Sequence, residues 1–202
     1  MTITILKPGL QTTIQSRPRT GLRHQGVPGG GAADPLSLAL ANRLVGNAWD
    51  APALEATLLG PTLRIDSSCA LAITGATCSA TLGGRALAGH ETVFAKPGDE
   101  LHLGSAEADA RIYIAFAGGI AVDDVLGSAS TNLQAGFGGH GGRALQAGDV
   151  LQLAGGRCDP LETPAEFRLP SSSSRALRTC VAAETELLDD VSLAALFDTN
   201  WV

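Results

Sequence analysis

The sequence predicts a mainly β protein whose short strands close into a barrel, with one or two short helices. Of its 202 residues, 25 are glycine and 10 are proline, which suits strands joined by tight turns better than a helical bundle. Aromatic residues make up 4% of the chain and charged residues 17%. The 45% hydrophobic content and this length are together enough to bury a substantial core.

Residues 35–45 form the best-defined predicted helix. Asp34 is a good N-cap, and Pro35 fits the first helical position, where its missing N–H costs nothing. Gly46 supplies a left-handed stop. One apolar stripe recurs at helical spacing and is predicted to be buried, consisting of Leu36, Leu40 and Leu44.

The rest of the chain to about residue 155 is predicted as strands, apart from a turn of helix expected after Asp50. Alternating or apolar runs predict strands at residues 2–6, 55–59, 62–65, 69–74, 78–82, 85–87 and 111–117. The pair Gly83-Gly84 predicts a hairpin. Residues 96–104 and 146–155 resemble each other, because in both a Gly-Asp turn opens a strand with its leucines on one face. This repeat is typical of a closing barrel, and two unrelated turns are the alternative.

We expect three parts along the chain. Residues 1–156 form the β-barrel domain, and residues 157–177, rich in proline and serine, form a linker. Residues 178–202 begin a second, incomplete domain, with a strand at 178–182 and a helix at 189–197 capped by Asp189 or Asp190. Such a segment cannot form a core by itself, so it docks on the first domain or belongs to a larger one.

Charge and cysteine pattern exclude several classes of protein. The net charge of −6 and the lack of basic clusters interleaved with aromatic residues argue against nucleic acid as a partner. No secretory leader or apolar span is visible, which predicts a soluble, cytoplasmic protein without a membrane partner. The four cysteines show no metal-ligand spacing, so we expect reduced thiols and no metal site, at Cys69, Cys78, Cys158 and Cys180.

Two glycine-rich loops concentrate the unusual residues. Residues 26–34 lead into the capped helix and could present amides to a carboxylate, carbonyl or phosphate, with a tight turn as the alternative. Residues 126–143 place hydroxyls and Arg143 near exposed amides, and Arg143 could pair bidentately with an anion. His140 is either an acid–base group or solvent-exposed. No hydrolase triad order or nucleophile elbow is present, so a self-sufficient hydrolase is not visible.

Ordered blocks along nearly the whole chain resemble the biotin-dependent carboxyltransferase family, also called allophanate hydrolase subunit 2. The blocks are residues 10–15, 26–35, 40–47, 54–55, 59–63, 117–120, 125–131 and 136–145. Where that family usually reads Gln-Asp-x-Gly-Arg, this chain has Gln15-Ser16-Arg17-Pro18-Arg19 and keeps the arginine. The resemblance implies cyclophilin-like β-barrels, the second of them incomplete here.

The same resemblance implies a function within a complex. Family members are similar to the C subunit of the ATP-dependent 5-oxoprolinase, a hydrolase that opens 5-oxo-L-proline to L-glutamate. The implied partners are a subunit-1-like protein, which is the B subunit of that complex, with the active site between the two chains, and a third subunit. ATP is the implied cofactor of the complex, and contact between ATP and this chain is left open.

Three alternatives follow from the same family. The chain could be the carboxyltransferase component of a urea carboxylase-type system, with biotin carried on a partner protein because Met1 is the only methionine. It could be a non-catalytic regulatory partner of a kinase-inhibitor-like subunit. It could also be an inactive truncated product, because later family blocks are absent.

The predicted substrate site draws on both glycine loops, and the catalytic residues are left unassigned. Asp34 organises the first loop, and Arg143 is the expected anion clamp. Asn42 has a solvated helix position as its alternative, and Glu55 a structural salt bridge. The complete set of predicted substrate-binding residues is Gly29, Gly30, Asp34, Asn42, Glu55, Ser128, Ser130, Thr131, Gly138, Gly139 and Arg143.

Overall fold

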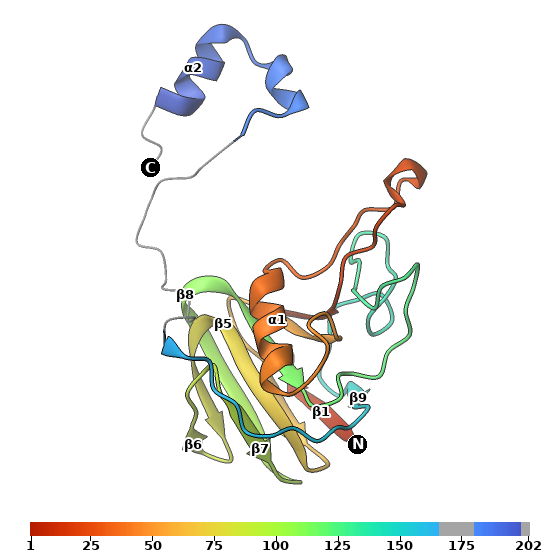
Figure 1. The fold of residues 1–202 in the computed structure, drawn as a ribbon, viewed down its shortest axis with the longest axis vertical. Helices are drawn as coiled ribbons and strands as arrows, with labels where there is room; N and C mark the ends of the chain where they lie inside the picture. Colours follow the sequence, from red (N-terminus) through yellow and green to blue (C-terminus); the bar gives the residue numbers. More distant parts are fainter. Residues whose placement is uncertain (166–179, 199–202) are drawn as a thin grey trace. The chain divides into compact units, whose positions relative to one another are not determined.

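Nine strands form one antiparallel sheet that curls into a half-barrel (Figure 1). The computed structural model describes residues 1–165 and 180–198 and divides the chain into two compact units, Met1–Leu169 and Pro170–Val202. The strands are β1 Thr2–Lys7, β2 Gln11–Gln15, β3 Ala53–Thr57, β4 Thr62–Ile65, β5 Cys69–Leu82, β6 Arg85–Ala86, β7 Thr92–Ala95, β8 Glu100–Phe116 and β9 Val150–Gln152. The predicted mainly β class is confirmed.

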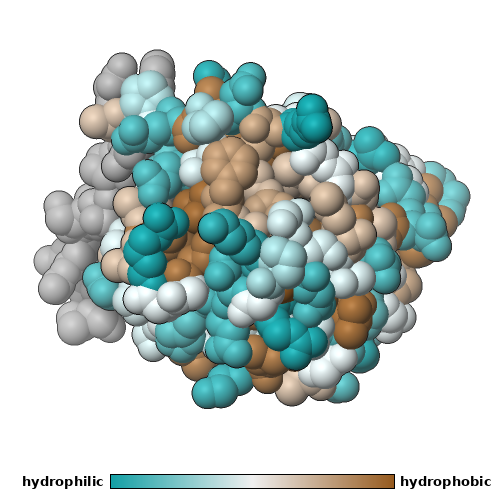
Figure 2. Space-filling model, turned by 90° about the horizontal axis from the view of Figure 1, so that it is seen from below, coloured by the Kyte–Doolittle hydropathy of each residue, from teal (hydrophilic) through white to brown (hydrophobic). Residues whose placement is uncertain are grey.

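The sheet follows the order β2-β3-β8-β4-β1-β9, and β5 pairs with β6, β7 and β8. The inner face of the curl carries the main core, in which Ile3, Leu54 and Phe116 are completely buried. Alternation along each strand puts these side chains on one face. On the surface seen from below, hydrophilic side chains surround a hollow in which hydrophobic ones gather (Figure 2).

Helix α1 (Pro35–Leu44) lies against β5 and β8 on the other face of the sheet (Figure 1). Asp34 accepts from the first-turn amides and caps the helix as predicted, and Gly46 has the expected positive φ of +72°. Of the predicted stripe only Leu44 is buried, since Leu36 is 50% exposed and Leu40 is half-buried. The buried face turns toward the sheet through Leu38, Ala41 and Leu44.

Strands β5 and β8 run through positions where the sequence predicts breaks. The predicted strands 69–74 and 78–82 are one strand of 14 residues, and 111–117 is the end of a strand of 17 residues. Gly75 has a φ of +87°, and a Cβ there would lie 2.2 Å from the carbonyl oxygen of Arg111. The register of β5 on β8 shifts after Gly75, so glycine bends the pair instead of ending it.

The two Gly-Asp segments adopt the same turn, which confirms the predicted repeat. Asp99 Oδ2 accepts from the backbone N–H of Lys96 at 2.8 Å, and Asp149 Oδ2 accepts from that of Gln146 at 2.7 Å. The leucines that follow are all buried, namely Leu101, Leu103, Leu151 and Leu153.

Other local expectations have mixed outcomes. The Gly83-Gly84 hairpin is confirmed, since it joins β5 to β6. The turn of helix expected after Asp50 is wrong, because residues 51–52 are not helical and β3 begins at Ala53. The strand predicted at 55–59 is instead β3, which ends where Leu58 takes a positive φ of +58°. Strands β2 and β7 have no counterpart among the expected strands.

The segment after β9 continues along the first unit. The backbone N–H of Thr92 donates to the carbonyl of Leu161 at 2.8 Å, and the backbone N–H of Thr163 donates to the carbonyl of His90 at 2.9 Å. Thr163 is 5% exposed. Residues 161–163 therefore lie beside β7.

The second unit contains the 3-10 helix η3 (Ala183–Leu187) and helix α2 (Asp190–Asp198). Asp189 Oδ1 accepts from the Ser192 N–H at 2.7 Å, which identifies the cap of the predicted helix. The strand predicted at 178–182 lies partly outside the described residues, and residues 180–182 are not in a strand. No helix in the described part of the chain is long and apolar enough to cross a membrane.

Candidate functional site

The two glycine-rich loops lie at the same end of the sheet (Figure 1). The buried side chain of Arg19 joins them, because it bonds carbonyls of the second loop and lies beside Gly30 of the first. Arg19 is 4% exposed. Its Nε donates to the carbonyl of Val125 at 2.9 Å, and its Nη2 donates to those of Ser128 and Ser130 at 3.1 and 2.6 Å. The ring of Phe137 lies 4.6 Å from the guanidinium carbon, a cation–π distance. Arg19 thus ties the chain after β2 to the second loop.

One end of this guanidinium is unused. Arg19 Nη1 is buried and has no hydrogen-bond partner among the described residues. Burial lowers the pKa of Arg19 from its usual value, because the protein around it solvates the charge less well than water. Both Gly29 and Gly30 line a neighbouring pocket of about 590 Å³ together with Arg19.

The predicted hydroxyls of the second loop face the protein itself. Ser128 Oγ donates to the carbonyl of Arg17 at 2.6 Å, and Ser130 Oγ lies 3.2 Å from the same oxygen. Thr131 Oγ1 donates to the carbonyl of Ile14 at 2.9 Å. All three side chains are buried. In this geometry they hold in place the main chain that leads into Arg19.

Gly138 and Gly139 allow the second loop to close on itself. A Cβ at Gly138 would lie 2.2 Å from the carbonyl oxygen of Ser130, and one at Gly139 would lie 2.0 Å from Thr131 Oγ1. Both residues also have positive φ angles. Only glycine fits at these positions, so their role is close packing beside Arg19.

Asp34 and Glu55 meet at the start of α1 through the hydroxyl of Tyr113. Glu55 Oε2 accepts from the Tyr113 hydroxyl at 2.7 Å and from the Ala33 N–H at 2.8 Å. The Asp34 N–H donates to the same hydroxyl at 2.7 Å. Burial and the adjacent Glu55 raise the pKa of Tyr113, so the phenol stays protonated and donates to the carboxylate. Arg111 lies 3.8 Å from Glu55 Oε1.

Asn42 is buried and holds the loop after α1 by hydrogen bonds. Its Nδ2 donates to the carbonyl of Ala51 at 2.9 Å, and its Oδ1 accepts from Asn47 at 2.9 Å. Asn47 in turn donates to the carbonyl of Phe116 at 2.8 Å. The network joins the end of α1 to β8 and lies apart from the Arg19 contacts.

Arg143 makes the bidentate clamp that the sequence predicts, with a carboxylate of its own chain. Its Nη1 and Nη2 donate to the two oxygens of Asp149 at 2.8 Å each. Hydrogen bonds from Arg143 lower the pKa of Asp149 to about 2. His140 Nε2 lies 3.5 Å from Asp149 Oδ1. The clamp thus fastens the second loop to the turn before β9.

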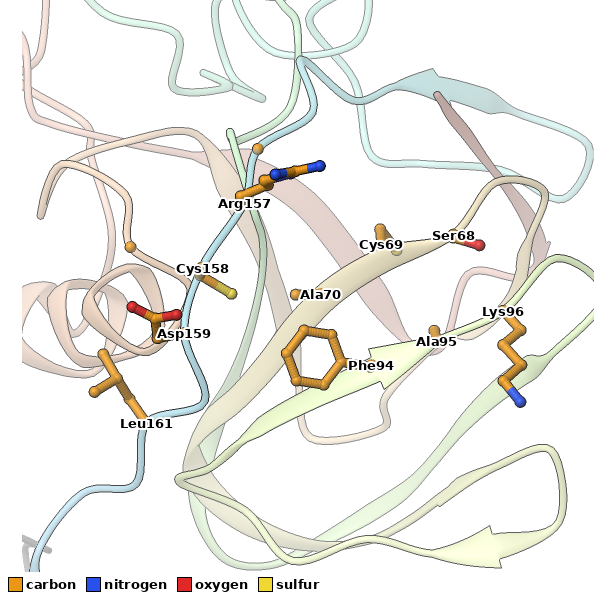
Figure 3. A pocket seen from close by; sticks show the side chains of 12 residues that line it. Ser68, Cys69, Ala70, Phe94, Ala95, Lys96, Arg157, Cys158, Asp159 and Leu161 are labelled. Carbon is orange, nitrogen blue, oxygen red and sulfur yellow. The ribbon is translucent and has the colours of Figure 1, made fainter.

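A larger pocket of about 790 Å³ lies between β7 and the segment after β9 (Figure 3). Phe94, which is 54% exposed, lies across it from Cys158. Burial raises the pKa of Cys69 to about 11 and also raises that of Cys158. These thiols therefore stay protonated at neutral pH and are poor nucleophiles. All four cysteines are free in this structure.

The structure brings the predicted residues together in separate groups. Around Arg19 lie the loop residues Gly29, Gly30, Ser128, Ser130, Thr131, Gly138 and Gly139. Asp34 and Glu55 form a second group at the start of α1, and Asn42 and Arg143 stand in networks of their own. Among the described residues, no three His, Cys, Asp or Glu side chains converge as metal ligands.

Two central residues were absent from the predicted site. Arg19 had one signal, its place as the arginine retained from the family pattern. Tyr113 is the only tyrosine in the chain and stands in an apolar strand, where a buried hydroxyl needs a partner. The sequence does not show which partner it finds.

Known proteins are similar to this chain in sequence and in fold. Residues 25–202 match the family described as carboxyltransferase domain, subdomain A and B. The chain is 43% identical over 152 residues to urea amidolyase of Saccharomyces cerevisiae, which covers 75% of this chain and 8% of that protein. It is 40% identical over 197 residues to the 5-oxoprolinase C subunit of Escherichia coli, which covers 98% of this chain and 63% of that protein.

The crystal structure of the Kluyveromyces lactis urea amidolyase superposes with a TM-score of 0.81 at 37% identity, over 85% of this chain and 11% of that one. The chain spans less than two thirds of the length of each of these relatives. The resemblance predicted from the ordered blocks is confirmed. On the match over residues 25–202, this chain belongs to the family of the carboxyltransferase domain, subdomain A and B.

Proposed function

We propose that this chain is a component of an ATP-dependent 5-oxoprolinase, in the role of its C subunit, and takes part in opening 5-oxo-L-proline to L-glutamate. The observation that carries the proposal is the extent of similarity to the Escherichia coli C subunit. That similarity covers 98% of this chain, whereas the similarity to the yeast urea amidolyase covers 75%.

The chemistry explains why ATP is needed. A lactam carbonyl is a poor electrophile, and its oxygen is a poor leaving group. Transfer of the γ-phosphoryl group of ATP to that oxygen releases ADP and activates the carbon for attack by water. Attack by one water with cleavage of the C–N bond would open the ring to an acyl phosphate, and a second water would hydrolyse it. The lactam, ATP and two waters would then give L-glutamate, ADP and inorganic phosphate.

The side chains described above argue against a catalytic role for this chain. The hydroxyls of Ser128 and Ser130 are engaged by backbone groups, and Arg143 is engaged by Asp149. We therefore assign catalytic groups to the partner proteins, namely the subunit-1-like protein (the B subunit) and a third subunit. ATP belongs to the complex in this proposal, with its contacts unassigned.

Reconstitution tests the proposal. The chain is mixed with the subunit-1-like and third-subunit proteins encoded in the same cell, and phosphate release is measured with and without 5-oxo-L-proline. We expect substrate-dependent release only when this chain is present. Release at full rate without it would refute the proposal, and association without turnover would favour a regulatory binding role.

A second candidate is the carboxyltransferase component of a biotin-dependent urea carboxylase. It is favoured by the 43% identity to yeast urea amidolyase and by the TM-score of 0.81 to the K. lactis enzyme. In that reaction a carboxyl group would pass from carboxybiotin, held on a partner protein, to urea. Transfer from a carboxybiotinylated carrier that depends on this chain would support this candidate over the first.

A further inference from the structure

Arg19 is a buried cation without a bonded carboxylate. Its three hydrogen bonds all end on carbonyl oxygens, and Nη1 has no partner among the described residues. Asp124 attracts Arg19 through space, but its Oδ2 already accepts from Arg17 at 2.8 Å. A buried charge with free N–H groups is costly unless an anion or further acceptors meet it.

The pocket beside Arg19 is cationic. It has a volume of about 590 Å³, and its lining includes Arg19, Arg23 and His24 but no Asp or Glu. Arg23 and His24 belong to the 3-10 helix η1 (Arg23–Gln25), and both side chains are exposed. The whole chain carries a net charge of −6, so this cluster of basic groups is opposite in charge to the molecule as a whole.

A glycine of the pocket lining lies close to Nη1. A Cβ at Gly30 would lie 3.5 Å from Arg19 Nη1, so this glycine is the residue in front of the free N–H groups. Gly30 and Gly31 both have positive φ, at +59° and +94°. On another side of the guanidinium the Phe137 ring excludes water. Nη1 itself is buried, so an anion in the pocket would reach this donor once Gly30 shifts.

We propose that this pocket, between residues 18–24 and Gly29–Gly30, binds an oxyanion, either a carboxylate or a phosphate group. The guanidinium of Arg19 supplies the fixed contact, and Arg23 supplies a second charge at the rim. Planar guanidinium groups match both kinds of oxyanion. The inference does not depend on the proposed function, because binding is a property of this chain alone.

Calorimetric titration of the full chain tests the proposal. The probes are inorganic phosphate, 5-oxo-L-proline and its uncharged analogue pyrrolidin-2-one. We expect saturable binding of at least one anion and none of the neutral lactam. Binding of 5-oxo-L-proline alone identifies a carboxylate site, and binding of phosphate alone identifies a phosphate site. Absence of saturable binding by both anions overturns the proposal, whatever the reconstituted complex does.

Variants locate the binding. Arg23→Ala removes an exposed charge and should weaken anion binding about tenfold, whereas Arg85→Ala, with the same charge change on β6, should leave the affinity unchanged. Arg19→Met should abolish binding if circular dichroism shows it folded. If it does not fold, the comparison of Arg23→Ala with Arg85→Ala decides. Equal affinity in those two variants would overturn the proposed location.

Discussion

Replacing Tyr113 with phenylalanine should destabilise the protein more than the loss of one ordinary hydroxyl. The Tyr113 hydroxyl donates to Glu55 Oε2 and accepts from the Asp34 N–H, both at 2.7 Å, and Tyr113 is fully buried. A hydrogen bond to a charged group contributes about 1.5–3 kcal/mol, and a buried group left without a partner costs about 1–3 kcal/mol. Glu55 keeps the Ala33 N–H, so we expect a net loss of about 2–4 kcal/mol.

Urea denaturation followed by far-UV circular dichroism measures this loss. The matched control is Thr74→Val, which removes another buried hydroxyl between the sheet and α1. Thr74 Oγ1 donates only to the carbonyl of Ser37, so its loss should cost about 1 kcal/mol. If Tyr113→Phe costs no more than Thr74→Val, the reasoning that Tyr113 anchors the first loop through Glu55 is refuted.

Three further predictions concern packing, pH and thiols. Gly138→Ala should lower the free energy of unfolding, measured by urea denaturation, by more than about 2 kcal/mol, because the new Cβ would lie 2.2 Å from a carbonyl oxygen. Gly141→Ala should lower it by about 1 kcal/mol, because no atom lies within 4 Å of the new Cβ. Equal losses in the two variants would contradict this prediction. Hydrogen bonds from Arg143 lower the pKa of Asp149 to about 2, so the ionised Asp149 stabilises the folded state fully above about pH 4. About 1 kcal/mol, after solvent screening, should disappear from pH 4 to 2, and Asp149→Asn should lack that step. The exposed thiol of Cys180 should react fastest with a disulfide reagent, and Cys180→Ser should remove that fast phase.

Much of the local structure could be predicted because its causes lie within a few residues. The Asp34-Pro35 cap and the Gly83-Gly84 hairpin are satisfied by their immediate neighbours. The face of α1 could not be predicted in the same way. Leu36 and Leu38 are equally apolar, and contact with β5 and β8 decides which one is buried.

The candidate site could be predicted only in its loops. The glycines of both loops and the serines of the second loop are locally unusual, so the sequence singles them out. Their roles depend on Arg19, whose partners Val125, Ser128 and Ser130 are 106 to 111 residues away in the chain. The sequence identifies Arg143 as a clamp for an anion. That this anion is Asp149 depends on the geometry of the loop.

By itself, the sequence determined the β class, the helix cap, the repeated Gly-Asp turns and the family. These depend on backbone preferences and on residue order, which need no knowledge of distant contacts. Three other features required the three-dimensional fold: β5 continues through Gly75, Tyr113 joins Glu55 to the first loop, and Arg19 is buried with one end free. Each of these results depends on the register between segments far apart in the chain, because a hydrogen bond or a close glycine contact exists only where that pairing places both partners.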